Sequence, residues 1–102
     1  MQKFNVVISD EASEDLFGIV DYLNNFSSAI GEKYYNEIDK KINSLEIMPK
    51  RCPLVYDEVL RAKGYRWLPV RNYTIFFVVD EYNNIVIVHA IVYSGREYTA
   101  LL

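Results

Sequence analysis

Two segments in the second half of the chain, residues 73–79 and 85–92, constrain the fold more than any other feature. Both are rich in β-branched and aromatic residues, which favours β-strands. In both, the two alternating sets of side chains are largely apolar. An antiparallel sheet with one face in water alternates apolar and polar residues instead. The sequence therefore predicts a sheet whose two faces both need cover.

The segment before these strands has the spacing of two amphipathic helices. Ser9-Asp10 is a helix-start signal, Asn24-Asn25 ends the first helix, Ser27 or Ser28 starts the second, and Pro49 closes it. We expect Glu37 and Lys41, four residues apart, to form a pair on the solvent side. The apolar positions are Ala12, Leu16, Ile19, Val20 and Leu23, then Ile30, Tyr34, Ile38, Ile42 and Leu45.

Because the connection between the two helices is so short, we expect them to form an antiparallel hairpin, which can cover one face of the sheet. The other face is then shielded by the C-terminal tail, by self-association or by a partner chain. Because the tail after Tyr93 is short, we expect an external partner.

The remaining elements complete an α+β fold. Phe4 to Ile8 predicts a short N-terminal strand, and residues 50–64 an irregular connection. Tyr65 to Val70 predicts a strand in which Pro69 marks a sheet edge or a bulge. With Tyr73 to Val79 and Ile85 to Tyr93, it forms a three-stranded antiparallel meander. The predicted order is β-α-α-β-β-β in a single domain of residues 1–102.

Charge is distributed unevenly along a chain whose net charge is −3. Residues 1–48 hold four Lys and nine Asp or Glu, a balance of −5, whereas residues 49–102 have a balance of +2. Six of the seven cations after residue 48 lie between Lys50 and Arg71. Either the helices are acidic and the loops basic, or a local basic face on an acidic protein binds an anionic partner.

Several kinds of chemistry are excluded by residue type. Cys52 is the only cysteine, so no intramolecular disulfide or cysteine-based zinc site is possible. His89, the only histidine, is interpreted as a structural residue within an apolar strand. There is no glycine loop for phosphate and no nucleophile elbow. We expect no metal, no cofactor and no membrane span, and a cytoplasmic location because no signal-peptide stretch is present.

What remains is a set of arginines and tyrosines around the predicted sheet. Arginine can bind phosphate with two hydrogen bonds, and tyrosine can stack on a base or carry a proton. Such a set could cleave RNA without a metal. Alternatively, these are ordinary surface residues whose stems pack on the sheet edge. The set comprises Arg66, Arg71, Arg96, Tyr65, Tyr73, Tyr93 and Tyr98.

The whole chain resembles the RelE/ParE superfamily of toxins from bacterial type II toxin–antitoxin systems. The resemblance implies a toxin that halts growth when its antitoxin is lost. It also implies a cognate antitoxin that wraps the toxin and covers exposed apolar and basic surface, with a homodimer or a toxin–antitoxin hetero-oligomer as possible assemblies. The matching segments are Val7-Ile8-Ser9 with Ala12 and Asp15-Leu16, then Arg51-Cys52-Pro53-Leu54-Val55, Gly64-Tyr65-Arg66, Val70 to Phe77, and Tyr93-Ser94-Gly95-Arg96-Glu97-Tyr98.

This superfamily contains two activities on one fold. RelE-like toxins cut messenger RNA on the ribosome, and in that case Arg66, Arg71, Arg96 and Tyr98 are the implied catalytic residues. ParE-like toxins poison DNA gyrase and are not nucleases.

Three residues and the overall charge of the chain weaken the nuclease interpretation. Thr74, Ala90 and Gly95 stand where relatives often carry cations, and this chain is acidic. We therefore favour a ParE-like inhibitor of DNA gyrase or another protein target. The alternatives are a ribosome-dependent mRNA endoribonuclease and an inactive antitoxin-binding module.

Overall fold

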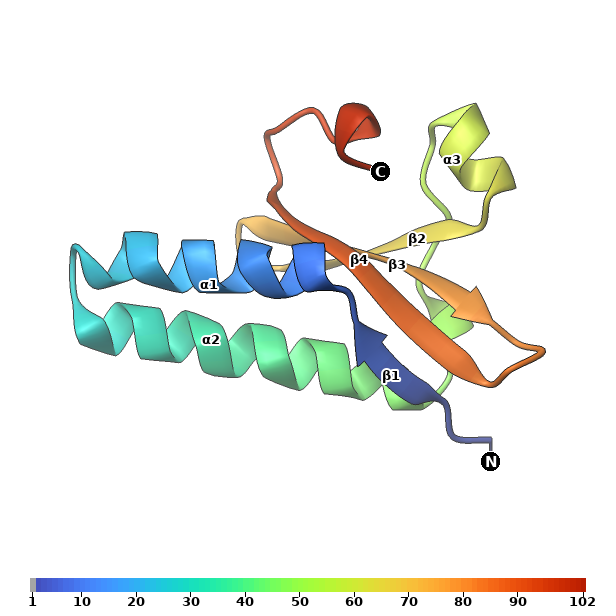
Figure 1. Ribbon diagram of the computed structural model, residues 1–102, viewed down its shortest axis with the longest axis horizontal. Coiled ribbons are helices and arrows are strands. Elements are labelled where there is room, and N and C mark those ends of the chain that lie inside the picture. Colours follow the sequence, from blue (N-terminus) through green and yellow to red (C-terminus); the bar gives the residue numbers. More distant parts are fainter. Residues whose placement is uncertain (1) are drawn as a thin grey trace.

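A computed structural model describes residues 2–102 of the chain (Figure 1). The principal elements are β1 (Asn5–Ile8), α1 (Asp10–Asn24), α2 (Ser28–Asn43), α3 (Glu58–Ala62), β2 (Tyr65–Val70), β3 (Tyr73–Asp80) and β4 (Ile85–Tyr93). Short 3₁₀ turns η1, η2 and η3 span Ser44–Glu46, Pro49–Arg51 and Thr99–Leu101. The predicted order of one strand, a helical hairpin and three strands is confirmed.

The four strands form one mixed sheet in the order β1-β4-β3-β2. The meander β2-β3-β4 is antiparallel, as predicted, and β1 pairs in parallel with β4, with Asn5 opposite Ile85. β2 is an edge strand, in agreement with Pro69. Its outer edge is protected, because the Trp67 amide donates to the Pro53 carbonyl and the Val55 amide to the Tyr65 carbonyl, at 3.2 and 3.0 Å.

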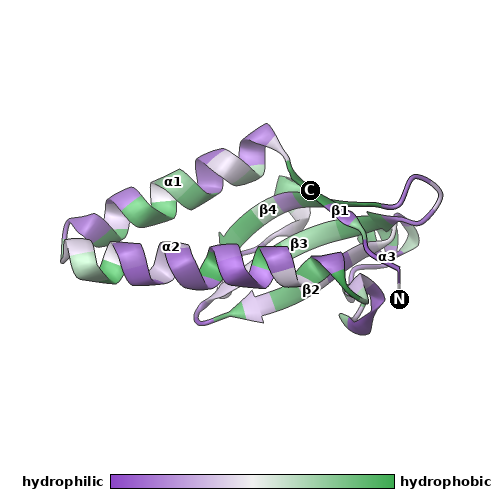
Figure 2. Cartoon of the chain, turned by 90° about the horizontal axis from the view of Figure 1, so that it is seen from below, coloured by the Kyte–Doolittle hydropathy of each residue, from purple (hydrophilic) through white to green (hydrophobic). Residues whose placement is uncertain are grey.

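The helical hairpin begins as the sequence predicts and covers one face of the sheet, which we call the helix face (Figures 1 and 2). Ser9 Oγ accepts from the Ala12 amide and Ser27 Oγ from the Ala29 amide, at 3.1 and 3.2 Å, so these two serines are the N-caps. The helix face buries Leu16, Ile38, Ile42, Leu45, Val70, Ile75, Phe77, Val86, Val88 and Ile91.

Two expectations about this hairpin were wrong. The second helix ends at Asn43, and residues 44–46 tighten into a 3₁₀ turn before Ile47 forms a bridge with Lys3. Glu37 pairs with Arg71 of the β2–β3 turn instead of Lys41, since the folded chain brings a guanidinium to it from another element.

The opposite side of the sheet, which we call the second face, is covered by short segments of the same chain. The connection over residues 50–64 is not irregular throughout, because it contains η2 and α3. Val55 and Leu60 from this connection pack on the second face, and Tyr98 and Leu102 of the tail pack beside them. Figure 1 shows α3 and the tail on the same side of the strands. The strand residues beneath them are Tyr65, Trp67, Phe76, Val78, Ala90 and Val92.

The pairing of β3 with β4 shifts register between Phe76 and Phe77. Phe76 is opposite Ala90 and Phe77 is opposite Val88, so His89 has no partner in β3. Such a bulge bends a strand and re-aims its side chains. The His89 ring contacts the Tyr65 ring edge-on at 5.3 Å, and burial lowers the pKa of the imidazole. Burial therefore disfavours the charged form of His89, whose ring packs against Tyr65.

Within residues 2–102, no helix combines the length and the apolar character that crossing a bilayer requires.

Candidate functional site

The second face is not completely covered, and a hollow of about 160 Å³ remains between the connection over residues 50–64 and the tail. It is lined by Trp67 of β2, Phe76 of β3 and Val92 of β4, together with Val55 of the connection and Tyr98 of the tail. Most of the lining is apolar or aromatic. A concave surface of this kind suits an apolar group with a few polar contacts.

The tail is held at this hollow by an aromatic stack. The rings of Tyr98 and Phe76 lie 4.7 Å apart with an interplanar angle of 23°. Glu97 stabilises the turn that follows, because its carboxylate accepts from the amide and the hydroxyl of Thr99 at 2.9 and 2.7 Å. These hydrogen bonds lower the pKa of Glu97. The position of Tyr98 thus depends on a short, locally capped turn.

Arg96 and Tyr98, two of the four predicted site residues, line this same hollow. Arg96 is exposed, and within the described residues its side chain makes no ion pair or hydrogen bond. Its guanidinium is therefore the cation at the hollow that remains available to a ligand.

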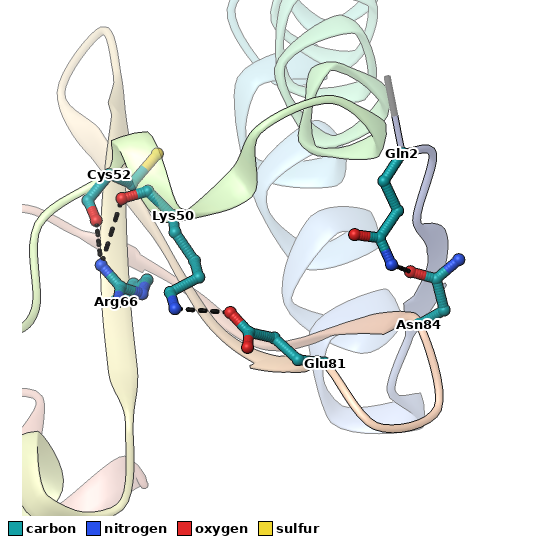
Figure 3. A network of polar contacts seen from close by, with 6 residues as sticks. All are labelled: Gln2, Lys50, Cys52, Arg66, Glu81 and Asn84. Carbon is teal, nitrogen blue, oxygen red and sulfur yellow. Dashed lines mark hydrogen bonds and ion pairs between the residues drawn. The ribbon is translucent and has the colours of Figure 1, made fainter.

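Arg66, the third predicted residue, lies on the other side of the sheet. Strand alternation places it with Leu68 and Val70 of the helix face, whereas Tyr65 and Trp67 belong to the second face. Its Nη1 donates to the Cys52 and Lys50 carbonyl oxygens at 2.6 and 3.4 Å (Figure 3). Arg66 therefore ties the η2 segment to β2.

Arg71, the fourth residue, occupies the tight turn between β2 and β3 with a backbone φ of 52°. Both guanidinium contacts go to Glu37 of α2, and the Arg71 Cζ lies 5.3 Å from the centre of the Tyr34 ring. The hydrogen bond from Arg71 lowers the pKa of Glu37 and raises the pKa of Arg71 itself. Arg71 thus fastens the turn to the hairpin.

Three of the other four cations between residues 50 and 71 also make internal contacts, and Lys63 is the exception among the described residues. Lys50 pairs with Glu81 at 2.5 Å (Figure 3). Arg51 donates to the carbonyls of Ile47 and Met48 at 2.8 and 3.1 Å, where α2 and η1 end. Carbonyl oxygens near a helix C-terminus favour a cation. The basic run in the sequence therefore serves largely to join loops, and does not form one continuous basic face.

The geometry divides the predicted set in two. Arg96 and Tyr98 meet at the hollow of the second face, while Arg66 and Arg71 are held on the helix side. The tyrosines divide similarly. Tyr73 is packed between Tyr34 and Tyr93, and burial raises its pKa, which disfavours the phenolate.

A second exposed surface, which was not predicted from the sequence, lies along α1. Phe17, Tyr22 and Phe26 are 62%, 58% and 68% exposed, and the Tyr22 and Phe26 rings contact each other at 5.4 Å. A signal for this surface was present, because Phe17 and Tyr22 fall between the apolar positions of the first helix. Large exposed apolar groups in proximity mark surfaces that bind other proteins.

Comparison with known proteins identifies the class of fold. The structure superposes on the chromosomal ParDE toxin–antitoxin system from Pseudomonas aeruginosa with a TM-score of 0.72 and 18% identity, covering 89% of this chain and 96% of that one. The toxin–antitoxin complex RelBE2 from Mycobacterium tuberculosis gives 0.66 and 13%, covering 89% and 98%. A mutant of the Escherichia coli toxin RelE in the free state gives 0.64 and 13%, covering 99% and 90%. At these identities the likeness establishes a shared α+β fold.

The family follows from the sequence. Residues 6–98 match the model of the ParE toxin of type II toxin–antitoxin systems, parDE. This match spans nearly the whole chain, so the chain belongs to the ParE toxin family and is a toxin of a type II toxin–antitoxin system. No curated protein matches the sequence significantly.

Proposed function

We propose that this toxin arrests growth by binding a protein target, DNA gyrase, and not by cutting messenger RNA. The observation that carries the proposal is the separation of the four arginine and tyrosine side chains. Arg96 and Tyr98 line the hollow of the second face, whereas Arg66 and Arg71 are held on the helix side. Membership of the ParE family adds independent support.

Metal-free cleavage of RNA needs a base, an acid and cations around a single phosphate. A candidate base or acid must come within about 3 Å of the proton it moves. Arg66 would have to release two carbonyl oxygens and Arg71 a carboxylate before either could bind phosphate. Arg96 would be left as the single cation beside Tyr98. One exposed cation provides little stabilisation for a doubly charged phosphorane.

A cognate antitoxin is the second partner that we propose. The solved ParDE and RelBE2 structures are toxin–antitoxin assemblies of this fold. The hollow beside Arg96 has the size and the apolar lining to receive a side chain of a neutralising chain. In this proposal the toxin is held inactive in the cytoplasm as part of a hetero-oligomer, and it acts on its target when the antitoxin is lost.

The first test maps messenger RNA 5′ ends minutes after the toxin is induced, with an Arg96→Ala variant beside it. We expect growth arrest with an unchanged map. In parallel, the purified toxin should block supercoiling of relaxed plasmid by gyrase.

New ends within translated codons that vanish in the Arg96→Ala variant would overturn the proposal in favour of a ribosome-dependent endoribonuclease. A wild-type chain that leaves growth untouched would instead indicate an inactive antitoxin-binding module.

A further inference from the structure

The solvent-exposed side of α1 carries a pattern of charge that the fold does not require. Residues 4–32 contain six carboxylates and no Lys, Arg or His. Asp10 and Glu11 lie in the first turn, where the helix dipole favours negative charge. Asp15 accepts from the Ile91 amide of β4 at 3.0 Å and so holds α1 against the sheet. Glu14 and Asp21 have neither role.

Glu14, Phe17 and Asp21 are spaced by three and four residues, and therefore share one stripe of α1. All three are exposed, as is Tyr22 beside them, and Phe26 follows at the end of the helix. Among the described residues, no Lys or Arg pairs with Glu14 or Asp21. We call Glu14, Phe17, Asp21, Tyr22 and Phe26 the α1 face. It combines three exposed aromatic rings with two unpaired carboxylates.

The neighbouring helix shows that this composition is particular to α1. α2 has Lys33, Lys40 and Lys41 among its three carboxylates, so its solvent side has charges of both signs. A mixed surface of this kind is what solubility alone requires. The α1 face has one sign of charge and apolar rings, which is the composition of a surface that meets a complementary one.

The charge of this face decides among possible partners. Carboxylates repel the phosphates of nucleic acids and of anionic membranes. A second copy of this chain offers few free cations in one place. Lys50 and Arg71 are paired with carboxylates, Arg51 and Arg66 donate to backbone carbonyls, and Lys33, Lys40 and Lys41 lie among the carboxylates of α2. The partner that fits is a different protein, with Lys or Arg around apolar pockets for the aromatic rings.

We propose that the α1 face binds a basic surface of the toxin's cellular target. This inference rests on the proposed function, since an enzyme that handles DNA presents basic surfaces that neutralise phosphates. Aromatic side chains provide most of the affinity in such interfaces, and the surrounding charges accelerate association and select the partner. The α1 face borders the hollow of the second face, because Glu14 and Tyr22 line grooves that also include Arg96. Phe17, Asp21 and Phe26 lie outside the lining of the hollow, so in this proposal target and antitoxin use adjacent surfaces that differ in these residues.

The test compares two face variants of the full-length toxin, Glu14→Gln/Asp21→Asn and Phe17→Ser/Tyr22→Ser. The matched control is Glu32→Gln/Tyr82→Ser, which changes an exposed carboxylate of α2 and a tyrosine that is 96% exposed in the β3–β4 turn. Growth arrest on induction, affinity for purified gyrase subunits and capture by the cognate antitoxin are measured for each. Circular dichroism verifies that each variant is folded.

We expect each face variant to lose growth arrest and to bind gyrase at least about tenfold more weakly, with antitoxin capture unchanged. Raising the salt from about 50 to about 200 mM should weaken the wild-type complex more than that of the Glu14→Gln/Asp21→Asn variant. The control variant should match the wild type in all three measurements.

The two proposals fail separately. If the wild type arrests growth without new messenger RNA ends and the face variants are equally toxic, the proposed role of the α1 face is overturned and the proposed function stands. Face variants that still arrest growth but lose antitoxin capture assign this surface to the antitoxin and overturn the inference. New messenger RNA ends, or no arrest by the wild type, overturn the proposed function and this inference with it.

Discussion

The two faces of the sheet are closed by different means. On the helix face, two helices of 15 and 16 residues bury a continuous core that includes Ile38, Ile42 and Phe77. On the second face, the five-residue helix α3 and the tail cover Phe76 and Val92 incompletely. Long amphipathic helices exclude water along a whole face, whereas short segments cover it at points and leave a hollow between them. Stability therefore resides mainly in one face, and the other retains room for a ligand.

The largest expected contrast is between two adjacent phenylalanines of β3. Phe77→Ala should lower the free energy of unfolding by about 3–5 kcal/mol, because Phe77 is fully buried in the helix-face core. Phe76→Ala should cost less, since Tyr98 and the tail can move into the space. Urea denaturation of both variants checks this. An equal or larger loss for Phe76→Ala would mean that the two faces are packed alike.

Two arginines provide the next comparison. Arg66→Gln should destabilise the protein by about 1–2 kcal/mol, because it breaks charge-assisted bonds to the carbonyls of Lys50 and Cys52. Arg96→Gln should leave the free energy of unfolding nearly unchanged, since its side chain makes no such contact in the described chain. The same denaturation assay measures both variants. A destabilised Arg96→Gln would show that this arginine supports the fold.

The attachment of the tail gives a smaller effect. Tyr98→Ala removes the stack on Phe76 and should cost about 1 kcal/mol. Limited trypsin digestion should then cleave after Arg96 faster than in the wild type, because the tail is no longer held at the hollow. Tyr82→Ala, at a highly exposed turn position, is the control and should digest like the wild type. Unchanged cleavage in Tyr98→Ala would show that other contacts hold the tail.

The smallest effect concerns the ion pair that links the hairpin to the β2–β3 turn. Arg71 lowers the pKa of Glu37, so this stabilisation is present above the usual carboxyl pKa of 4.5 and is lost as pH falls through the folded-state value. In Arg71→Ala the decline of stability below about pH 4.5 should be shallower. Urea midpoints between about pH 3 and pH 6 measure the difference. If the wild type and Arg71→Ala lose stability in parallel as the pH falls, this ion pair does not contribute to the pH dependence of stability.

Residue patterns predicted the elements of this fold well and their contacts less well. The alternation in Tyr73 to Val79 predicted a sheet buried on both faces, and the spacing from Ala12 to Leu45 predicted the hairpin. α3 was missed because five residues are too few for a helical period to appear. Glu37 was assigned to Lys41 because sequence spacing reveals only neighbours along the helix, and Arg71 is 34 residues away.

The separation of the candidate site residues between the two faces of the sheet could be predicted in part from the sequence. Arg66 lies between Tyr65 and Trp67 in β2, so strand alternation alone separates its side chain from theirs. The sequence did not reveal that Trp67, Arg96 and Tyr98 line the same hollow, because this depends on the strand order and on the path of the tail. The α1 face was open to prediction from the absence of any cation between Lys3 and Lys33.

The parallel pairing of β1 with β4 has a consequence for synthesis. Asn5 lies opposite Ile85, 80 positions later, so the first strand made must wait for the fourth and last strand of the sheet. Contacts at such separations close late, because the entropy of a long loop must be overcome first. At a synthesis rate of about 5–20 residues per second, β1 stays unpaired for several seconds on each nascent chain. A toxin built in this way completes its sheet only after β4 has been synthesised, 80 positions after β1.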